Sequence, residues 1–402
     1  MIPTTIRFLW KNNAIVNMKH FKNPFITSII NFIDMQILKL GTALPKNEYS
    51  TEKLLETFPC SLPEGVKQNV LNLGVQRRYL INHANTKEGM DENAIIKLCS
   101  EACEKAVQNA GLSAKDINYF IAAYDATPFL SPGLSQLLVR NIGFTPYIKH
   151  VNAQGIASTA FPKALELAEN YLAAHPKDYV LICISGVSSC WFQNQVHGMT
   201  DVMEIKHINQ IKSAAKRRDE LQKWVATMEF FLFGDGAAAC VVANKGEGLT
   251  VEKNVEVTNI VKKDYLAGYA KLSASNKPFS FGFYSHLDKK IPELGVKYTS
   301  LALKKLFGKT NRDAIKKVKK WAVHTGSEKI LATLAERNEI PYEKIKESHE
   351  ILREYGNLAG ASLPFILERI ISNTKLVEEN AITLLGYGWG FSAAACLLKF
   401  KH

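Results

Sequence analysis

Two apolar patterns alternate along this chain from about residue 35 onward, and this alternation limits the fold more than any other feature. In one pattern, apolar residues recur at helical spacing, as in residues 92–110, which end beside Gly111. In the other, short apolar runs such as residues 117–123 are typical of buried strands. Strands that alternate with helices predict an α/β architecture. The expected strands are 35–45, 117–123, 179–187, 237–243, 322–325 and two within 381–400, and the expected helices are 92–110, 132–143, 163–174, 299–306 and 328–338.

The length and composition fit an ordinary globular protein. A chain of 402 residues is long enough for two domains or for one duplicated fold with a large core. Hydrophobic residues make up 47% and charged residues 22%, which is typical of soluble proteins. The seven cysteines show no metal-ligand spacing, and their odd number and apolar surroundings indicate reduced, buried thiols. We therefore expect a cytoplasmic protein without a bound metal.

The first 34 residues differ in charge from the rest. Arg7, Lys11, Lys19 and Lys22 occur there, and no acidic residue precedes Asp34. The segment lacks the compact apolar core and cleavage site of a secretory signal, and no run reaches the length of a membrane span. A presequence or a weak membrane contact stays open beside the simpler interpretation as a tail or a misassigned start. The folded part is expected to begin near residue 35.

The net charge of +12 points to acidic partners. Nucleic acid, a membrane surface and anionic small molecules are the three classes that such a charge favours. No nucleic-acid-binding motif is present, so we expect no nucleic-acid partner. A generally lysine-rich proteome explains the charge equally well.

Five stretches follow one another in an order that is more specific than any one of them. Residues 142–158 read Ile-Gly-Phe-Thr-Pro-Tyr-Ile-Lys-His-Val-Asn-Ala-Gln-Gly-Ile-Ala-Ser, a turn and a strand that lead into a helix start. Residues 233–239 read Phe-Gly-Asp-Gly-Ala-Ala-Ala, and residues 321–327 read Trp-Ala-Val-His-Thr-Gly-Ser. Residues 353–358 read Arg-Glu-Tyr-Gly-Asn-Leu, and residues 386–392 read Gly-Tyr-Gly-Trp-Gly-Phe-Ser.

Taken in this order, the five stretches resemble those of type III polyketide synthases and β-ketoacyl synthases III, over roughly residues 36–400. The resemblance implies the duplicated, five-layered αβαβα thiolase-like fold. It also implies that His324 and Asn357 are catalytic, and their separation is that of the family. It further implies that Phe233 gates the substrate tunnel and that the hairpin with Gly388 and Gly390 helps to form an oxyanion hole.

Each of these residues also has an ordinary structural interpretation. A histidine after a strand is usually a core or surface side chain, and Asn357 beside a glycine would more often belong to a turn. The glycines of residues 386–390 would suit a tight turn between strands. Phe233 would serve equally well as a core residue. The shared order and spacing favour active-site roles for His324 and Asn357. One departure is the loop after the histidine, where His-Pro-Gly-Gly of the family has become His-Thr-Gly-Ser.

Ser158 occupies the position at which these families carry a nucleophilic cysteine. Ungapped counting from Gly143 reaches Ser158, and so does counting backward from the strand at 179–185. The alternative places the cysteine position on Ile156, as a Gln-Gly-Cys motif with isoleucine in the cysteine's place. That alignment requires two extra residues in the following helix, so we favour Ser158 as the nucleophile.

A serine changes the expected chemistry. A cysteine at a helix N-terminus yields a thiolate readily, whereas a serine hydroxyl needs a general base during its attack. His324 is the obvious base, and Asn357 would orient its ring as in a Ser-His-Asn triad. An acyl-serine is an oxygen ester and a weaker acyl donor than a thioester. Acyl transfer, one condensation and hydrolysis therefore stay open, and long iterative chain building is disfavoured.

A basic segment before residue 233 is an insertion relative to chalcone-synthase-like chains. It contains Lys216, Arg217 and Arg218 among apolar residues and indicates a basic amphipathic helix. One interpretation is a cap that binds the acidic groups of a carrier protein or the phosphates of coenzyme A. The other, which we weigh somewhat higher, is a solvated helix.

These observations combine into one prediction with a rival. We expect an acyltransferase or polyketide-type β-ketoacyl synthase that acts on acyl-coenzyme A or acyl-carrier thioesters through an acyl-serine, with decarboxylative condensation of a malonyl extender within its scope. Coenzyme A or phosphopantetheine enters as substrate, and no cofactor is expected to stay bound. The resemblance implies a homodimer. The rival is a non-acylated subunit that pairs with a cysteine-bearing paralogue. The expected segments are an extension (1–34), a half with the nucleophile (35–185), a cap (186–232) and a half with the histidine and asparagine (233–402).

Overall fold

A nine-stranded mixed sheet with the order β11-β12-β13-β8-β1-β7-β6-β4-β5 organises the chain. The computed structural model describes residues 34–82, 91–127, 129, 131–265, 267–274, 281–288, 290–308 and 312–401. The strands of this sheet are β1 (Gln36–Ala43), β4 (Ile117–Tyr124), β5 (Lys149–Gln154), β6 (Tyr179–Ser185), β7 (Ala237–Ala243), β8 (Gly248–Val257), β11 (Lys320–Val323), β12 (Ala381–Gly388) and β13 (Ser392–Lys401).

The two halves of the sheet repeat one topology. In the first half, the order is β5-β4-β6-β7-β1, with β4 and β6 parallel and the β6–β7 and β7–β1 pairs antiparallel. In the second half, β11-β12-β13-β8 repeats that order and those directions. The halves meet where β1 pairs with β8. A separate isolated parallel bridge joins Phe233 to Asn357. The predicted duplicated fold is therefore confirmed.

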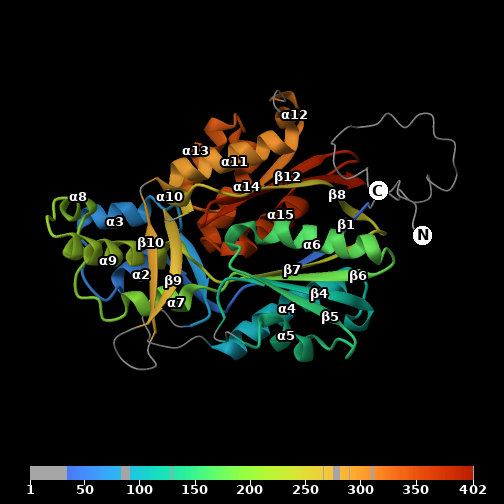
Figure 1. Cartoon of the computed structure of the whole chain (residues 1–402), viewed down its shortest axis with the longest axis horizontal. Helices are drawn as coiled ribbons and strands as arrows, with labels where there is room; N and C mark the ends of the chain where they lie inside the picture. Colours follow the sequence, from blue (N-terminus) through green and yellow to red (C-terminus); the bar gives the residue numbers. More distant parts are fainter. Residues whose placement is uncertain are drawn as a thin grey trace, which may run out of the picture. The chain divides into compact units, whose positions relative to one another are not determined.

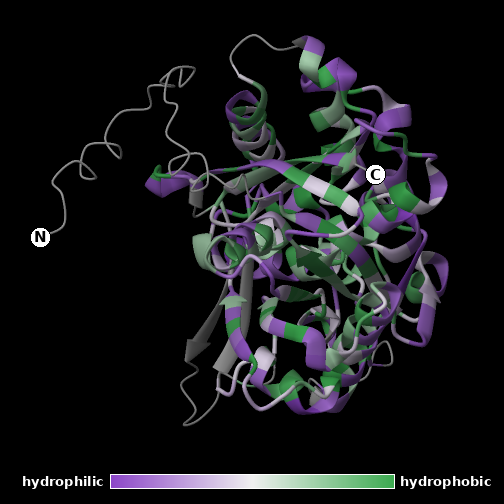
Figure 2. Cartoon of the chain, turned by 90° about the vertical axis from the view of Figure 1, so that its right-hand side faces the viewer, coloured by the Kyte–Doolittle hydropathy of each residue, from purple (hydrophilic) through white to green (hydrophobic). Residues whose placement is uncertain are grey.

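Helices complete the five layers. The two helices α6 (Ala160–Ala174) and α15 (Ser362–Asn373) occupy the middle of the molecule, between the two halves of the sheet (Figure 1). The helices α4 (Glu92–Asn109) and α5 (Leu134–Ile142) cover one outer face. The opposite outer face carries α11 (Ile291–Phe307), α13 (Glu328–Arg337) and α14 (Tyr342–Tyr355). Figure 2 shows hydrophobic residues concentrated in the central strands, as expected for strands buried on both faces.

Helix α4 illustrates how sequence produces this packing. Asp91 caps its first turn by accepting hydrogen bonds from the N–H groups of Asn93 and Ala94. Small residues on its inner face let its backbone approach β1 so closely that a Cβ on Gly41 would lie 2.4 Å from the Ala106 nitrogen. A Gly41→Ala substitution would push the helix from the sheet.

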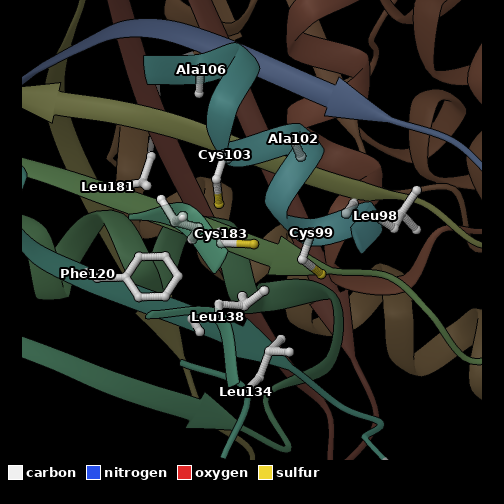
Figure 3. Packing of buried hydrophobic residues seen from close by; sticks show 14 of the residues in the cluster. Leu98, Cys99, Ala102, Cys103, Ala106, Phe120, Leu134, Leu138, Leu181 and Cys183 are labelled. Carbon is white, nitrogen blue, oxygen red and sulfur yellow. The ribbon is translucent and has the colours of Figure 1, made fainter. Parts of the chain in front are cut away.

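Three thiols lie in the core beneath α4. Cys99 and Cys103 project from the helix toward Cys183 of β6 (Figure 3), and all three are fully buried. Hydrogen bonding to Cys183 and burial hold the pKa of the Cys99 thiol well above its ordinary value. These thiols are therefore packing residues rather than nucleophiles. The prediction of buried thiols is wrong for Cys60, which is only partly buried.

Most predicted elements are confirmed with small shifts of their ends. Helix α6 begins at Ala160, three residues earlier than its expected start, because Pro162 is accommodated in its first turn. Helix α11 begins at Ile291 instead of residue 299, and Pro292 again lies at its start. The hairpin of β9 (Gly268–Ala274) and β10 (Phe281–Leu287) was not expected from the sequence.

A smaller helical lobe lies to one side of the nine-stranded sheet (Figure 1). Its apolar core joins α2, α3, α7 and α9, and the basic segment forms α8 and the start of α9. None of the helices in the described ranges combines the length and the hydropathy that a bilayer span requires. The remaining elements are β2 (Asn47–Ser50), β3 (Arg77–Leu80), α2 (Thr51–Glu56), α3 (Glu64–Leu71), α7 (Ser189–Val196), α8 (Ile205–Ile208), α9 (Ala214–Leu232), α10 (Lys262–Tyr265) and α12 (Arg312–Lys317).

Candidate active site

Ser158 lies at the entrance to the central helix α6. The chain leaves β5, turns at Gly155 (φ 73°) and again at Ala157 (φ 46°), and passes through a short 3₁₀ turn into the helix. The Ala157 N–H donates to an Asp125 carboxylate oxygen at 3.0 Å, which fixes the turn to the end of β4. Ser158 is 6% exposed. It therefore stands where helix N–H groups and the helix dipole favour negative charge.

The glycine-rich end of β12 packs directly on this turn. A Cβ on Gly386 would lie 2.3 Å from the Ser158 carbonyl oxygen. A Cβ on Gly388 would lie 2.6 Å from the Ala157 Cβ and 3.1 Å from the Ser158 nitrogen. Both glycines are needed because no side chain fits between β12 and the turn. The glycine-rich hairpin of β12 and β13 and the predicted nucleophile Ser158 are far apart in the sequence but lie in contact in the structure.

His324 follows the last residue of β11 and is anchored to the same strand β12. Its N–H donates to the Leu385 carbonyl at 3.0 Å. Its ring packs edge-on against that of Tyr387, with 5.2 Å between centroids. The side chain is 3% exposed, and Nδ1 is buried without a hydrogen-bond partner. Burial lowers the pKa of His324 to about 3, so the imidazole is neutral near pH 7.

Asn357 lies between the two halves of the molecule, next to Phe233. Its N–H donates to the Leu232 carbonyl at 2.9 Å, and its carbonyl accepts from the Gly234 N–H at 3.2 Å. Its side-chain oxygen accepts from the Ala359 N–H at 2.9 Å. Ala359 has φ 47°, nearly the value of Ala157. The turn before α15 therefore repeats the turn before α6, as the duplicated fold requires.

Ser362 ties the histidine segment to the asparagine segment. Its hydroxyl accepts from the Leu358 N–H at 3.1 Å and shares a hydrogen bond of 2.9 Å with the Thr325 hydroxyl. Gly360 in turn lies against α6, where its Cβ position is 2.9 Å from the Ala160 Cβ. The segments that carry Ser158, His324 and Asn357 are thus neighbours in space.

The hydrogen bonds of a Ser-His-Asn triad are not formed among the described residues. No hydrogen bond joins Ser158 to His324 or His324 to Asn357 within the ranges that the structure describes. The Asn357 oxygen instead holds the backbone of Ala359. Catalytic hydrogen bonds often tighten only when substrate is bound, so this geometry does not remove any of the three residues from the site.

Phe233 ends helix α9 beside Asn357. Its ring stacks on that of Phe192, with 4.6 Å between centroids. The side chain is partly buried, which suits both a gate and a core residue. Lys216, Arg217 and Arg218 lie at the opposite, exposed end of α9. The structure therefore does not bring these basic residues to the Ser158 turn.

Asp235 is a buried residue that our sequence interpretation missed. Its carboxylate accepts from the Ile81 N–H at 2.9 Å, from the Ser188 and Ser189 N–H groups at 3.0 Å each, and from the Ser189 hydroxyl. Burial raises its pKa, and these hydrogen bonds oppose that change. The signal was present, because an aspartate between two glycines in an apolar motif needs buried donors. Asp235 fixes the loop that follows Phe233.

Comparison with known proteins shows which families the chain is similar to. Residues 273–399 match the model of the C-terminal domain of chalcone and stilbene synthases. The chain is 22% identical over 374 residues to 3,5-dihydroxyphenylacetyl-CoA synthase of Amycolatopsis orientalis, covering 90% of this chain and 92% of the relative. It is 24% identical over 374 residues to β-ketoacyl-[acyl-carrier-protein] synthase III of Clostridium perfringens, covering 90% and 98%.

The fold likewise matches solved structures of this class. The crystal structure of 1,3,6,8-tetrahydroxynaphthalene synthase from Streptomyces coelicolor superposes with a TM-score of 0.75 at 23% identity, covering 91% of this chain and 99% of that chain. At this identity the similarity establishes the thiolase-like fold.

Proposed function

We propose that this chain, which resembles type III polyketide synthases and β-ketoacyl synthases III over most of its length, is an acyl-transferring synthase with serine in place of cysteine. The observation that carries the proposal is the contact of Gly386 and Gly388 with the Ser158 turn, while the adjacent Leu385 holds His324. These backbone contacts support a site formed by the Ser158 hydroxyl, the His324 imidazole and backbone N–H donors.

In the first step, the Ser158 oxygen attacks the carbonyl carbon of an acyl thioester. The C–S bond breaks, the thiol leaves with a proton, and an acyl-serine ester forms. The tetrahedral oxyanion would be stabilised by the Ser158 N–H and by an N–H from the hairpin of Gly388 and Gly390. The closeness of Gly388 to the Ser158 nitrogen supports this pairing.

His324 is better suited to donate a hydrogen bond than to hold a proton. An imidazole whose pKa is about 3 is a weak base, so removal of the serine proton needs help from the developing oxyanion, which raises that pKa. As a neutral donor, His324 would stabilise the enolate that forms when a malonyl extender loses carbon dioxide, together with the Asn357 amide. The enolate carbon would then attack the ester, the C–O bond would break, and the released Ser158 oxygen would take a proton from solvent.

A second function is favoured by one observation. Because Ser158 has no hydrogen bond to His324 in the described structure, its hydroxyl is not activated before substrate binds. The chain would then be a non-acylated subunit that pairs with a cysteine-bearing paralogue. His324 and Asn357 would serve only in decarboxylation. Co-purification with such a paralogue would favour this alternative.

Intact mass spectrometry after incubation with a panel of acyl-coenzyme A and acyl-carrier thioesters separates the two functions. Acyl transfer predicts a covalent adduct that peptide mapping places on Ser158 and that Ser158→Ala abolishes. An adduct on a cysteine, or none with any thioester, would contradict the acyl-serine. We further propose that the protein works in the cytoplasm as a homodimer, and sedimentation of the purified chain would test the dimer.

A further inference from the structure

The turn that joins β12 to β13 is held from two sides. On the inner side, the Cβ position of Gly388 lies 3.1 Å from the Ser158 nitrogen. Within the turn, the Phe391 N–H donates to the Gly388 carbonyl at 3.0 Å, and Gly390 has φ 76°. On the outer side, the Asn259 side chain donates from Nδ2 to the Gly390 carbonyl at 3.1 Å. The turn therefore lies between the predicted nucleophile and one amide side chain.

The Asn259 amide is fixed by its other partners. Its Oδ1 accepts from the Val261 N–H at 2.6 Å and lies 2.9 Å from the Tyr298 hydroxyl. Only this orientation of the amide pairs donors with acceptors, because a flipped amide would place oxygen against the Gly390 carbonyl. The side chain is therefore held in one direction, although Asn259 belongs to the loop after β8.

Tyr298 connects this loop to helix α11. Its side chain is buried, and its hydroxyl lies 2.9 Å from both Asn259 Oδ1 and Asp264 Oδ2. The Lys297 ammonium donates to the same Asp264 oxygen at 2.8 Å. The hydrogen bonds from Lys297 and Tyr298 lower the pKa of Asp264, so its carboxylate is charged near pH 7. Since the Tyr298 ring also lies beside Phe391, with 6.2 Å between centroids, this network anchors the turn to α11.

We propose that Asn259 is a positioning residue that aligns the β12–β13 turn as part of the oxyanion hole. The inference rests on the proposed function, because it assumes that an N–H of this turn stabilises the oxyanion together with the Ser158 N–H. Two donors act on one oxygen only when both point at the place where negative charge develops. The hydrogen bond from Asn259 to the Gly390 carbonyl sets the position of the second donor. Asn259 thus acts through the backbone of the turn and not on the substrate.

Comparing acylation with alkylation in the Ser158→Cys protein tests this role. Acylation by the fastest-reacting acyl-coenzyme A of the panel forms a tetrahedral oxyanion, whereas alkylation by iodoacetamide displaces iodide and needs no oxyanion hole. Asn259→Asp keeps the acceptor for Val261 but has no Nδ2 hydrogens for the Gly390 carbonyl. We expect this variant to slow single-turnover acylation about tenfold and to leave the alkylation rate unchanged. The loss is smaller than the roughly hundredfold effect of removing an oxyanion donor, because the donor is displaced and not removed.

Asn380→Asp is the matched control. Asn380 precedes the opposite end of β12, is partly buried like Asn259, and uses Oδ1 to accept from the Val377 N–H at 3.2 Å. The same substitution there should change neither rate. Equal slowing of acylation and alkylation by Asn259→Asp would overturn the proposal, as would unchanged acylation or an equal loss in Asn380→Asp.

Hydrogen exchange separates this inference from the proposed function. Mass spectrometry of a peptide over residues 386–392 measures how readily the turn opens, whether or not an acyl group is transferred. We expect faster exchange in Asn259→Asp than in Asn380→Asp. If exchange is faster but no thioester acylates the Ser158→Cys protein, the positioning of the turn stands and the proposed reaction falls. Unchanged exchange would overturn the positioning role.

Discussion

Gly386 approaches Ser158 so closely that a Cβ on the glycine would lie 2.3 Å from the serine carbonyl oxygen. We predict that Gly386→Ala displaces the Ser158 turn and lowers the free energy of unfolding by about 1–3 kcal/mol, as overpacking generally does. Because the Ser158 turn is displaced, the amount of acyl adduct should also fall. Urea unfolding and adduct mass spectrometry measure the two effects.

Gly295→Ala is the control for that substitution. The Cβ position of Gly295 lies 3.6 Å from the Tyr387 ring, which is ordinary contact, and Gly295 lies inside helix α11. Because alanine favours helix over glycine, this variant should be neutral or more stable by about 0.5–1 kcal/mol. An equal loss of unfolding free energy in Gly386→Ala and Gly295→Ala would contradict a destabilising clash at the Ser158 turn.

Ser158→Cys should acylate faster than the wild type. A thiol ionises far more readily than a hydroxyl, and a helix N-terminus favours the thiolate. The variant should also react with iodoacetamide and condense malonyl extenders at least as well, because a thioester is the better acyl donor. Labelling followed by peptide mapping checks the site. Absence of both acylation and labelling would favour the partner-subunit function.

His324→Ala should lose acylation in the wild-type background and retain part of it in the Ser158→Cys background. The reason is that a serine needs the imidazole during attack, whereas a thiolate is already nucleophilic. Single-turnover acylation of the wild type, His324→Ala, Ser158→Cys and the double variant measures how far the effect of the histidine depends on the nucleophile. Full acylation of His324→Ala would show that another group accepts the serine proton.

His324 should also make stability depend on pH. Its pKa is about 6.5 when unfolded and about 3 when folded, so the folded state binds fewer protons between these values. The free energy of unfolding that depends on a neutral His324 is therefore fully present above pH 6.5. It is lost as pH falls from 6.5 toward 3, by about 1.4 kcal/mol per pH unit. Comparing the urea unfolding of the wild type and His324→Gln from pH 4 to 7 isolates it. Parallel curves would contradict a buried, neutral histidine.

Asp235→Asn should destabilise the loop after Phe233 by about 2–4 kcal/mol. The amide nitrogen of asparagine cannot accept, so donors now held by the carboxylate would be buried without partners. Ser189→Ala removes one donor and keeps the carboxylate, so it should cost less. Thermal unfolding compares the stability of the two variants. A larger loss of stability in Ser189→Ala than in Asp235→Asn would contradict the role of the carboxylate as the shared acceptor.

Much of the fold could be predicted from the sequence because the signals are local. Residues 237–243 form β7 as expected, since a continuous apolar run suits a strand buried on both faces. The helix expected at 92–110 ends one residue earlier, before Gly111 with φ 68°. The hairpin of β9 and β10 escaped prediction because its alternating stretch, Ala-Lys-Leu-Ser-Ala at residues 270–274, is short and begins and ends on alanine, which favours helix.

The sequence by itself determined the α/β architecture, the order of the motifs and the candidates Ser158, His324 and Asn357. Only the tertiary structure decided which of them become neighbours. The Ser158 turn meets Gly386, and Phe233 pairs with Asn357, across long stretches of chain. Periodicity reports which face of an element is buried, but not which distant element buries it. That choice depends on packing the whole sheet and its helices at once, and so does the burial that keeps His324 neutral.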